Sequence, residues 1–292
     1  MAISPKLLSK GVPLKDDRFP GGLRTGAQYL TALRNDGRRV FIDGEEVRDV
    51  TSHPAFAEPA KTIAGLFDIA CNPANADLMT YSSPTSGAPV NRIWQLPDSI
   101  DALNQRRAAI ERWSEESLGY MGRTPDHVAG FFAGFAAAPQ VLARDGNAQF
   151  ADNALRIYEF LRDNDVYITY TIVPPQIDRS KPAHQQEPSD LYCGVVKERD
   201  DGIVIKGAQM LGTGSVFSDY VHQSTIHPMR PGDENHAISL IVPCNAPGLK
   251  IYSRRSYAGA ASNNGSDQSE KDRADRSDRP SENCPFSELP IV

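Results

Sequence analysis

The chain lacks the patterns that mark membrane, secreted and nucleic-acid-binding proteins. Its 292 residues contain no apolar run of about 18 residues that could cross a bilayer, and residues 1–22 contain no apolar segment of a secretory signal. The formal net charge is -6, whereas nucleic-acid binding normally requires a basic face. We therefore expect a cytoplasmic protein that binds neither membranes nor nucleic acid.

Cysteine and phosphate-binding glycine motifs are also scarce. No Cys-x-x-Cys and no cysteine–histidine pair at metal-ligand spacing is present, so we expect no metal site. We interpret the scattered cysteines as small buried side chains: Cys71, Cys193, Cys244 and Cys284. No Gly-x-Gly-x-x-Gly or P-loop signature follows a predicted strand, so a nicotinamide cofactor site within the chain is not expected.

What the sequence does contain is a change of periodicity near residue 165. Before it, apolar residues recur at helical spacing, which predicts helices over 25–33, 56–67, 99–116, 128–138 and 148–163, with one Asp-Gly hairpin at 39–47. After it the period approaches two, which predicts strands over 166–173, 191–198, 203–210, 221–226, 238–242 and 249–252. Separate runs of helices and strands indicate an α+β fold.

These runs divide the chain into four predicted parts. They are a loosely docked arm over 1–24, a helical domain with a small hairpin over 25–163, a β domain over 164–258, and a disordered tail over 259–292. Leu103, Ile110 and Trp113 are expected on the buried face of their helix. The helix over 128–138 is apolar all round, so it is expected to be buried.

The segment Met121-Gly-Arg-Thr-Pro-Asp-His127 joins two predicted helices and concentrates chemical groups. It places an arginine, a carboxylate and an imidazole within five residues. Arg123 stays charged and offers five donors, which suits an oxyanion, and His127 titrates near neutrality, which suits a base. Two structural interpretations stand beside these: an ion pair of Arg123 with Asp126 at the helix start, and an exposed turn position for His127.

Several short segments, in the same order, resemble the 4-hydroxyphenylacetate 3-hydroxylase family from about Thr25 to about Tyr257. They are Gly26-x-x-Tyr-Leu30, Val47-x-Asp-Val-Thr-x-His-Pro-Ala-Phe56, Gly122-Arg-Thr-Pro-Asp126, Ile177-Asp-Arg179, Gly207-Ala208 and Ser253-Arg254-x-Ser-Tyr257. The resemblance implies an acyl-CoA-dehydrogenase-like fold with an N-terminal helical domain and a middle antiparallel, barrel-like β domain. It also implies a C-terminal helical bundle, which is missing from this sequence.

The resemblance further implies an activity. Members of the family are oxygenase components of two-component aromatic monooxygenases, to which a separate NAD(P)H–flavin reductase supplies FADH2. O2 then adds at C4a of the flavin, and the distal oxygen of the hydroperoxide is transferred ortho to the hydroxyl group of a phenol. The implied cofactor is therefore reduced FAD with O2 as co-substrate, the implied partners are a reductase and a phenol, and full-length relatives form homotetramers.

Site residues follow from the same resemblance. The implied catalytic residues are Arg123, His127 and Tyr170, and the implied phenol contacts are Arg123, His127, Ser215 and Val216. The implied flavin contacts are Tyr170, Thr171, Ile172, Gln176, Asp178, Arg179 and Thr213. His127 stands where relatives often have a tyrosine and Tyr170 where they have a histidine, so a phenol other than 4-hydroxyphenylacetate is expected. The alternatives are packing within a sheet for Tyr170 and a simple turn for Leu211-Gly-Thr-Gly-Ser215.

The segment from Ser262 onward does not resemble the continuation of the family, and we interpret the chain as truncated. A second hypothesis is therefore an inactive fragment, or a flavin- or partner-binding module without catalysis. An acyl-CoA dehydrogenase activity is disfavoured, because its carboxylate belongs to the missing part. A 4-hydroxybutyryl-CoA dehydratase activity is disfavoured, because its closely spaced cluster cysteines are not present.

Overall fold

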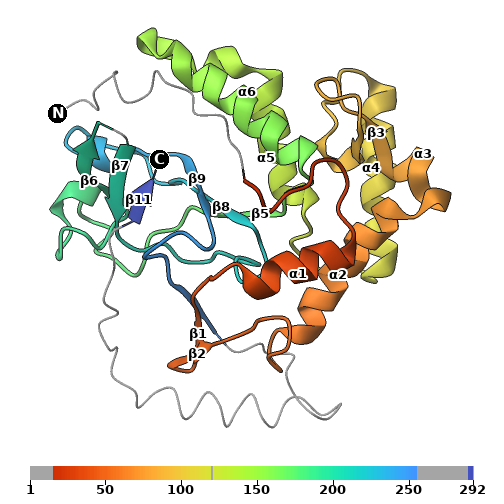
Figure 1. The fold of residues 1–292 in the computed structure, drawn as a ribbon. Helices are drawn as coiled ribbons and strands as arrows, with labels where there is room; N and C mark the ends of the chain where they lie inside the picture. Colours follow the sequence, from red (N-terminus) through yellow and green to blue (C-terminus); the bar gives the residue numbers. More distant parts are fainter. Residues whose placement is uncertain (1–15, 120, 201, 255–288, 292) are drawn as a thin grey trace.

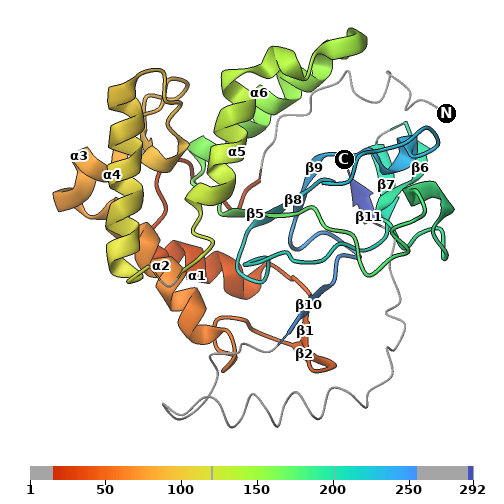
Figure 2. The ribbon, with the colours of Figure 1, turned by 180° about the vertical axis from the view of Figure 1, so that it is seen from behind.

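The computed structural model describes residues 16–119, 121–200, 202–254 and 289–291, with the helices preceding most of the strands (Figure 1). The helices are α1 (Gly26–Asn35), α2 (Ala57–Cys71), α3 (Ala76–Met79), α4 (Ile100–Glu116), α5 (Asp126–Ala137) and α6 (Ala148–Asp163). Both views place α3 and α4 on the side opposite β6 (Gly194–Arg199) and β7 (Gly202–Lys206), with β5 (Ile168–Thr171) and β8 (Tyr220–Gln223) between them (Figures 1 and 2). None of the described helices is long and apolar enough to span a membrane.

Local capping chemistry fixes where two of the helices begin. Thr25 caps α1 in a capping box, in which its hydroxyl accepts from the Gln28 N–H at 3.2 Å and the Gln28 amide oxygen accepts from the Thr25 N–H at 2.8 Å. Ser99 caps α4 by accepting from the Ala102 N–H at 3.1 Å. The predicted starts of these two helices are therefore confirmed.

Two expectations about buried helix faces need correction. Leu103 of α4 is 48% exposed, whereas Ala102, Ala109 and Trp113 are buried, and the Trp113 indole N–H donates to the Leu66 carbonyl at 3.0 Å. The face of α4 that packs on the core is therefore the one that carries the large Trp113 side chain together with Ala102 and Ala109. Helix α5 buries one face only, because Phe131 on the other is 39% exposed.

The strands form separate small sheets. One contains β1 (Val40–Ile42), β2 (Glu45–Val47) and β10 (Ile251–Ser253), and another contains β6 (Gly194–Arg199), β7 (Gly202–Lys206) and β11 (Leu289–Ile291). A hairpin joins β3 (Thr80–Ser82) to β4 (Pro89–Asn91). The sheet nearest the helices orders β5 (Ile168–Thr171), β8 (Tyr220–Gln223) and β9 (Leu240–Pro243). The hairpin predicted at 39–47 is confirmed as β1–β2, and the strands predicted over 191–198 and 203–210 pair with each other as β6–β7.

The expectation of a wholly antiparallel β domain is wrong, and its barrel-like shape is not confirmed. In the part of the chain that the structure describes, the strands make sheets of two or three strands, and β5–β8 and β1–β10 pair in parallel. An alternating sequence pattern predicts a strand but carries no information about its direction or partner. The hairpin β3–β4 is not among the predicted elements, because the Ser, Pro and Gly residues between Tyr81 and Pro89 are typical of a loop.

Both chain ends differ from expectation where they are described. Residues 16–24 are firmly docked rather than loose: Phe19 is buried in the core, and the Arg24 guanidinium contacts the Asp219 carboxylate at 2.6 Å. Residues 289–291 form β11 against β7, whereas the rest of the predicted disordered tail lies outside the described residues, together with Cys284. Cys193 and Cys244 are buried as predicted, and Cys71 is half-buried.

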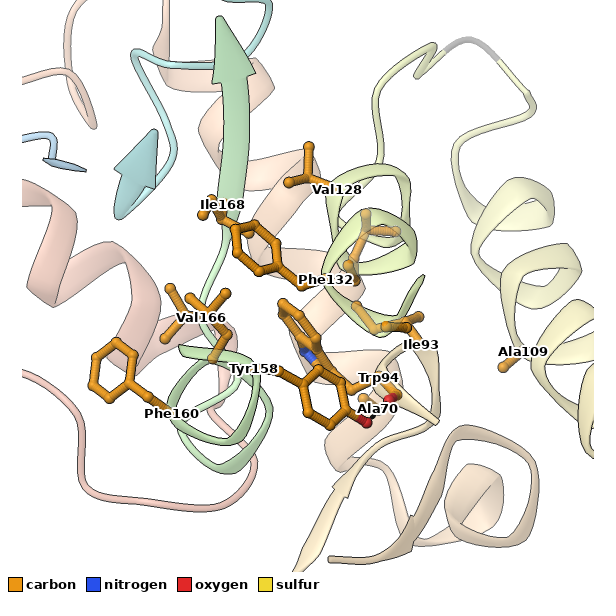
Figure 3. Close-up of a cluster of buried hydrophobic side chains, with 14 of the residues drawn as sticks. Ala70, Ile93, Trp94, Ala109, Val128, Phe132, Tyr158, Phe160, Val166 and Ile168 are labelled. Atoms are coloured by element: carbon orange, nitrogen blue, oxygen red, sulfur yellow. Dashed lines mark hydrogen bonds between the residues drawn. The ribbon is translucent and has the colours of Figure 1, made fainter. Parts of the chain in front are cut away.

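A shared apolar core packs α5 and α6 against β5. Figure 3 shows Phe132 of α5 and Ile168 of β5 in one cluster with Trp94 and Tyr158, whose rings meet edge to face with centroids 6.4 Å apart. Fully burying an apolar side chain of this size contributes about 1.5–3 kcal/mol. The start of α5 is therefore held at a fixed place beside the middle of β5.

Candidate active site

A small cavity of about 10 Å³ lies between the start of α5 and β5, enough for about one water molecule. Its walls come from the segment before α5, from α5, from β5 and from the loop at 211–213. The lining residues are Arg123, Thr124, His127, Val128, Ile168, Thr169, Tyr170, Leu211 and Thr213. The three predicted catalytic residues are therefore brought together, although Tyr170 lies 47 positions beyond Arg123.

Arg123 is the centre of the polar contacts in this cavity. Its Nη1 donates to the Tyr170 hydroxyl at 2.6 Å and also to Nε2 of His127, one turn further along. The guanidinium carbon lies 5.0 Å from the centroid of the Tyr170 ring, which adds a cation–π attraction. The Asp126 carboxylate instead accepts from the Thr124 hydroxyl, so the proposed Arg123–Asp126 ion pair is not found among the described contacts.

His127 is held as a neutral imidazole. Because a guanidinium can only donate, Nε2 must be the accepting nitrogen and the proton resides on Nδ1. Burial and the neighbouring Arg123 charge lower the pKa of His127 below its ordinary 6.5, although Asp126 acts in the opposite direction. At neutral pH this side chain is therefore available as a base rather than as an acid.

Phe131, which the sequence did not indicate, packs its ring against two of the site residues. Its ring centroid lies 5.1 Å from that of His127 and 5.5 Å from that of Tyr170, and the two latter rings are 5.4 Å apart. The three rings thus form a mutual cluster beside the Arg123 guanidinium. The available signal was the spacing of four residues from His127, which places both side chains on one face of a helix.

The loop over 211–215 approaches β5 closely. Gly214 has a φ of +83°, and a side-chain carbon there would lie 2.7 Å from the Tyr167 hydroxyl. Thr213 reaches the cavity, whereas the buried Ser215 hydroxyl lies 3.2 Å from the Thr169 hydroxyl, beneath it. A glycine is therefore required for this approach, so more than a simple turn is present.

Other predicted contacts lie away from this cavity. Val216 is buried in a separate apolar cluster with α1 and α2, and the buried Thr171 hydroxyl donates to the Met210 carbonyl at 3.2 Å. The Ile172 carbonyl accepts from the Ile226 N–H at 3.2 Å. Gln176 and Asp178 are exposed on the following loop, and Arg179 lines a second cavity.

Five cavity residues were not predicted. All five lie within or next to segments that contain predicted residues: Thr124, Val128, Ile168, Thr169 and Leu211. Their contribution depends on how α5 crosses β5, which a sequence pattern does not specify. Within the described residues no group of three or more histidine, cysteine, aspartate or glutamate side chains could hold a metal ion.

Known proteins resemble this chain in sequence and in fold. The profile described as 4-hydroxyphenylacetate 3-hydroxylase N terminal matches residues 25–279, beyond the motifs that end near Tyr257. The 4-hydroxyphenylacetate 3-monooxygenase oxygenase component of Geobacillus sp. (strain PA-9) is 35% identical over 236 residues, which are 80% of this chain and 47% of the relative. The oxygenase component of 4-nitrophenol 2-monooxygenase from Rhodococcus sp. is 35% identical over 247 residues, 83% of this chain and 47% of the relative.

The structural similarity covers about the same part of the chain as the sequence similarity. The crystal structure of the oxygenase component of 4-hydroxyphenylacetate 3-monooxygenase, complexed with FAD and 4-hydroxyphenylacetate, matches with a TM-score of 0.74 and 31% identity, covering 82% of this chain and 48% of that one. This chain thus spans about half the length of the relatives it matches. The profile match, the identities and the shared fold agree, and the chain belongs to the 4-hydroxyphenylacetate 3-hydroxylase family.

Proposed function

We propose that this chain forms part of an oxygenase component that hydroxylates a phenol ortho to its hydroxyl group, with reduced FAD and O2. The observation that carries the proposal is the convergence of Arg123, His127 and Tyr170 on one cavity. A fixed cation beside a neutral imidazole suits the formation of a phenolate. The names of the relatives, a 4-hydroxyphenylacetate and a 4-nitrophenol monooxygenase component, support a phenol as substrate.

In this proposal His127 removes the proton of the phenol. The O–H bond breaks, the proton moves to Nε2, and the electron pair stays on the oxygen as phenolate. The Arg123 guanidinium, which otherwise donates to Nε2, turns to the phenolate and stabilises its charge. Tyr170 accepts from Arg123 through its oxygen, so its own proton is free to donate to a bound oxygen atom.

Flavin, when bound in its reduced form, supplies the activated oxygen. We propose that it is held over β5 by the side chains or backbone of Tyr170, Thr171, Ile172, Gln176, Asp178, Arg179 and Thr213. The buried amide oxygens of Gln209 and Gln223 have no hydrogen-bond partner among the described residues, and both amide groups face the Ser224 carbonyl beyond the end of β5. Such unpaired acceptors fit a ligand that carries ring N–H groups.

Substrate binding requires the site to open. A cavity of about 10 Å³ has no room for a phenol, so the ring cluster of His127, Phe131 and Tyr170, or the loop over 211–215, must move. Since two residue types are exchanged across the site, we propose a phenol other than 4-hydroxyphenylacetate, with Ser215 near it. Val216, in its separate cluster, is less well situated for this contact. We also propose a separate flavin reductase as partner, and a cytoplasmic homotetramer for the complete protein.

Product analysis tests this function. The chain is mixed with a general flavin reductase, NADH, FAD, ¹⁸O2 and a panel of phenols, and products are identified by mass spectrometry. We expect a catechol that carries one ¹⁸O, and none when Arg123→Ala replaces the wild-type chain. The reductase without the chain controls for free peroxide.

The second candidate is a flavin- or partner-binding module without catalysis. It is favoured by the small size of the cavity, which holds about one water molecule. Absence of labelled product from every phenol, with flavin still bound in a titration, would favour this candidate over hydroxylation.

A further inference from the structure

The Asp126 carboxylate is the group of the segment 121–127 to which the proposed reaction gives no role. Asp126 is the first residue of α5 and is half-buried. Its oxygen accepts a hydrogen bond from the Thr124 hydroxyl. Thr124 and His127 line the cavity, whereas Asp126 is not among the described residues that do so. Asp126 therefore acts on the site through its neighbours rather than by touching a ligand.

The contact between Asp126 and Thr124 closes the turn that separates Arg123 from His127. The Thr124 carbonyl accepts from the His127 N–H at 3.1 Å, and the Thr124 hydroxyl donates to Asp126. These two hydrogen bonds hold the same short turn through its backbone and through its side chains. Since Arg123 Nη1 donates to both His127 and Tyr170, a small change in this turn would break one of these contacts. Asp126 therefore helps to keep the cation and the imidazole within reach of each other.

Asp126 also supplies negative charge beside His127. Burial and then the Arg123 cation lower the pKa of His127, and the Asp126 carboxylate opposes them. The amino end of a helix carries a partial positive charge, which acts in the same direction as Arg123. The group that faces His127 from β5 is Tyr170, whose hydroxyl accepts from Arg123. Without Asp126, the positive charge would act on the imidazole unopposed and make it a weaker base.

A second cation, Arg106 of α4, faces the same turn of α5. Its Nε donates to the Ile93 carbonyl at 2.9 Å, and its Nη2 would lie 3.3 Å from a side-chain carbon on Gly130. Gly130 lies four residues after Asp126, so both are on one face of α5. Burial lowers the pKa of Arg106, and attraction to the Asp126 carboxylate opposes this. The Asp126 charge therefore acts on α4 as well as on His127, which ties the amino end of α5 to α4.

We propose that Asp126 is a positioning residue for the reaction, which fixes the turn that carries Arg123 and His127 and offsets the Arg123 cation beside the imidazole. This inference rests on the proposed function in one respect, the use of His127 as the base. Its two parts can be separated, because an asparagine at this place keeps an oxygen that accepts from Thr124 but carries no charge. An alanine removes both the acceptor and the charge.

The titration of His127 tests the proposal without any turnover. The imidazole resonances of the full chain are followed by NMR across the pH range in which histidine titrates, at one low ionic strength, because salt screens the effect. The variant His127→Gln identifies the resonance. We expect the pKa of His127 to be lower in Asp126→Asn than in the wild type. Asp126→Glu keeps the charge, so it should stay closer to the wild type.

Asp101→Asn is the matched control, because Asp101 lies exposed in the first turn of α4 and loses the same charge. It should leave the pKa of His127 unchanged. In the reductase-coupled assay, Asp126→Asn should reduce turnover at least about three-fold and move the acidic limb of the pH profile to lower pH, since a weaker base removes the phenol proton more slowly. Circular dichroism checks that the variants are folded.

Other results would overturn the proposal. An unchanged or raised pKa of His127 in Asp126→Asn would exclude the effect of charge, and an equal decrease in Asp101→Asn would reduce it to the net charge of the chain. A loss of turnover without a shift of the acidic limb would leave Asp126 with a structural role alone. If the pKa decreases as expected but the wild type hydroxylates no phenol, the result counts against the proposed function and not against the effect of Asp126 on His127.

Discussion

The Arg123 guanidinium donates to the Tyr170 hydroxyl over 2.6 Å and lies 5.0 Å from the centre of its ring. This contact joins the segment before α5 to the middle of β5, and so joins the helical part of the chain to the sheets. Because Nη1 also contacts His127, the three groups share one donor rather than acting separately. A change at any of them alters the hydrogen bonds of the other two.

Replacing Arg123 by lysine should reduce phenol hydroxylation by about 100-fold, because a single ammonium cannot reproduce the planar donor set. The turnover number in the reductase-coupled assay measures this loss. Arg107→Lys is the matched control, since Arg107 pairs with Glu111 on the exposed face of α4 and with no other described carboxylate, and it should keep wild-type turnover. An Arg123→Lys variant with full activity would remove Arg123 from the proposed chemistry.

Much of the helical region and the central residues of the site could be predicted from the sequence. The capping residues Thr25 and Ser99 fixed helix starts because capping is a local interaction. Arg123 and His127 were recognised because they are four residues apart on one short segment. Tyr170 was added from the family resemblance, since nothing local connects it to Arg123.

The remainder depends on contacts between distant segments. Arg24 was predicted to lie in a loosely docked arm. Its partner, Asp219, follows 195 positions later, so nothing near Arg24 in the sequence indicates the contact. The parallel pairing of β5 with β8 depends on the path of the chain between them, not on the pattern of either strand. The second cavity is lined by two loops that follow the ends of these strands, so no single segment of the sequence revealed it.

Substituting alanine for Gly214 should destabilise the fold by at least about 1 kcal/mol, because φ of +83° is unfavourable for a side chain. The new carbon would also lie 2.7 Å from the Tyr167 hydroxyl. Gly134→Ala on α5 is the control: its side chain would meet nothing within 4 Å, and a helical alanine should stabilise by about 0.5–1 kcal/mol. Urea denaturation of both variants measures the difference, and equal stabilities would contradict the close approach of the loop.

The free energy of unfolding should decrease at acidic pH, because His222 is buried in its neutral form. This side chain is buried against Phe132 and Phe135, its Nδ1 has no described partner, and burial lowers its pKa from 6.5 to about 4. The unfolded chain therefore binds a proton first as the pH falls below 6.5, and the native state loses up to about 3 kcal/mol by pH 4. Denaturation of wild type and His222→Phe across this range, at constant ionic strength, should give curves that diverge. Parallel curves would show that His222 is solvated.

Removing either partner of the buried Arg24–Asp219 pair should cost about 3–5 kcal/mol, because the remaining charge stays buried and loses its bidentate partner. The pair is bidentate, at 2.6 and 3.2 Å, and Asp219 also accepts from the Tyr167 N–H at 2.8 Å. Replacing both partners with Arg24→Met/Asp219→Leu should cost less than Asp219→Ala alone, since neither member of the pair then remains as a buried, unpaired charge. The surface pair Arg39–Glu46, with both side chains nearly half exposed, is the control, and breaking it should change stability very little. Similar losses at the two pairs, measured by urea denaturation, would mean that the segment at 16–24 does not hold its docked position in solution.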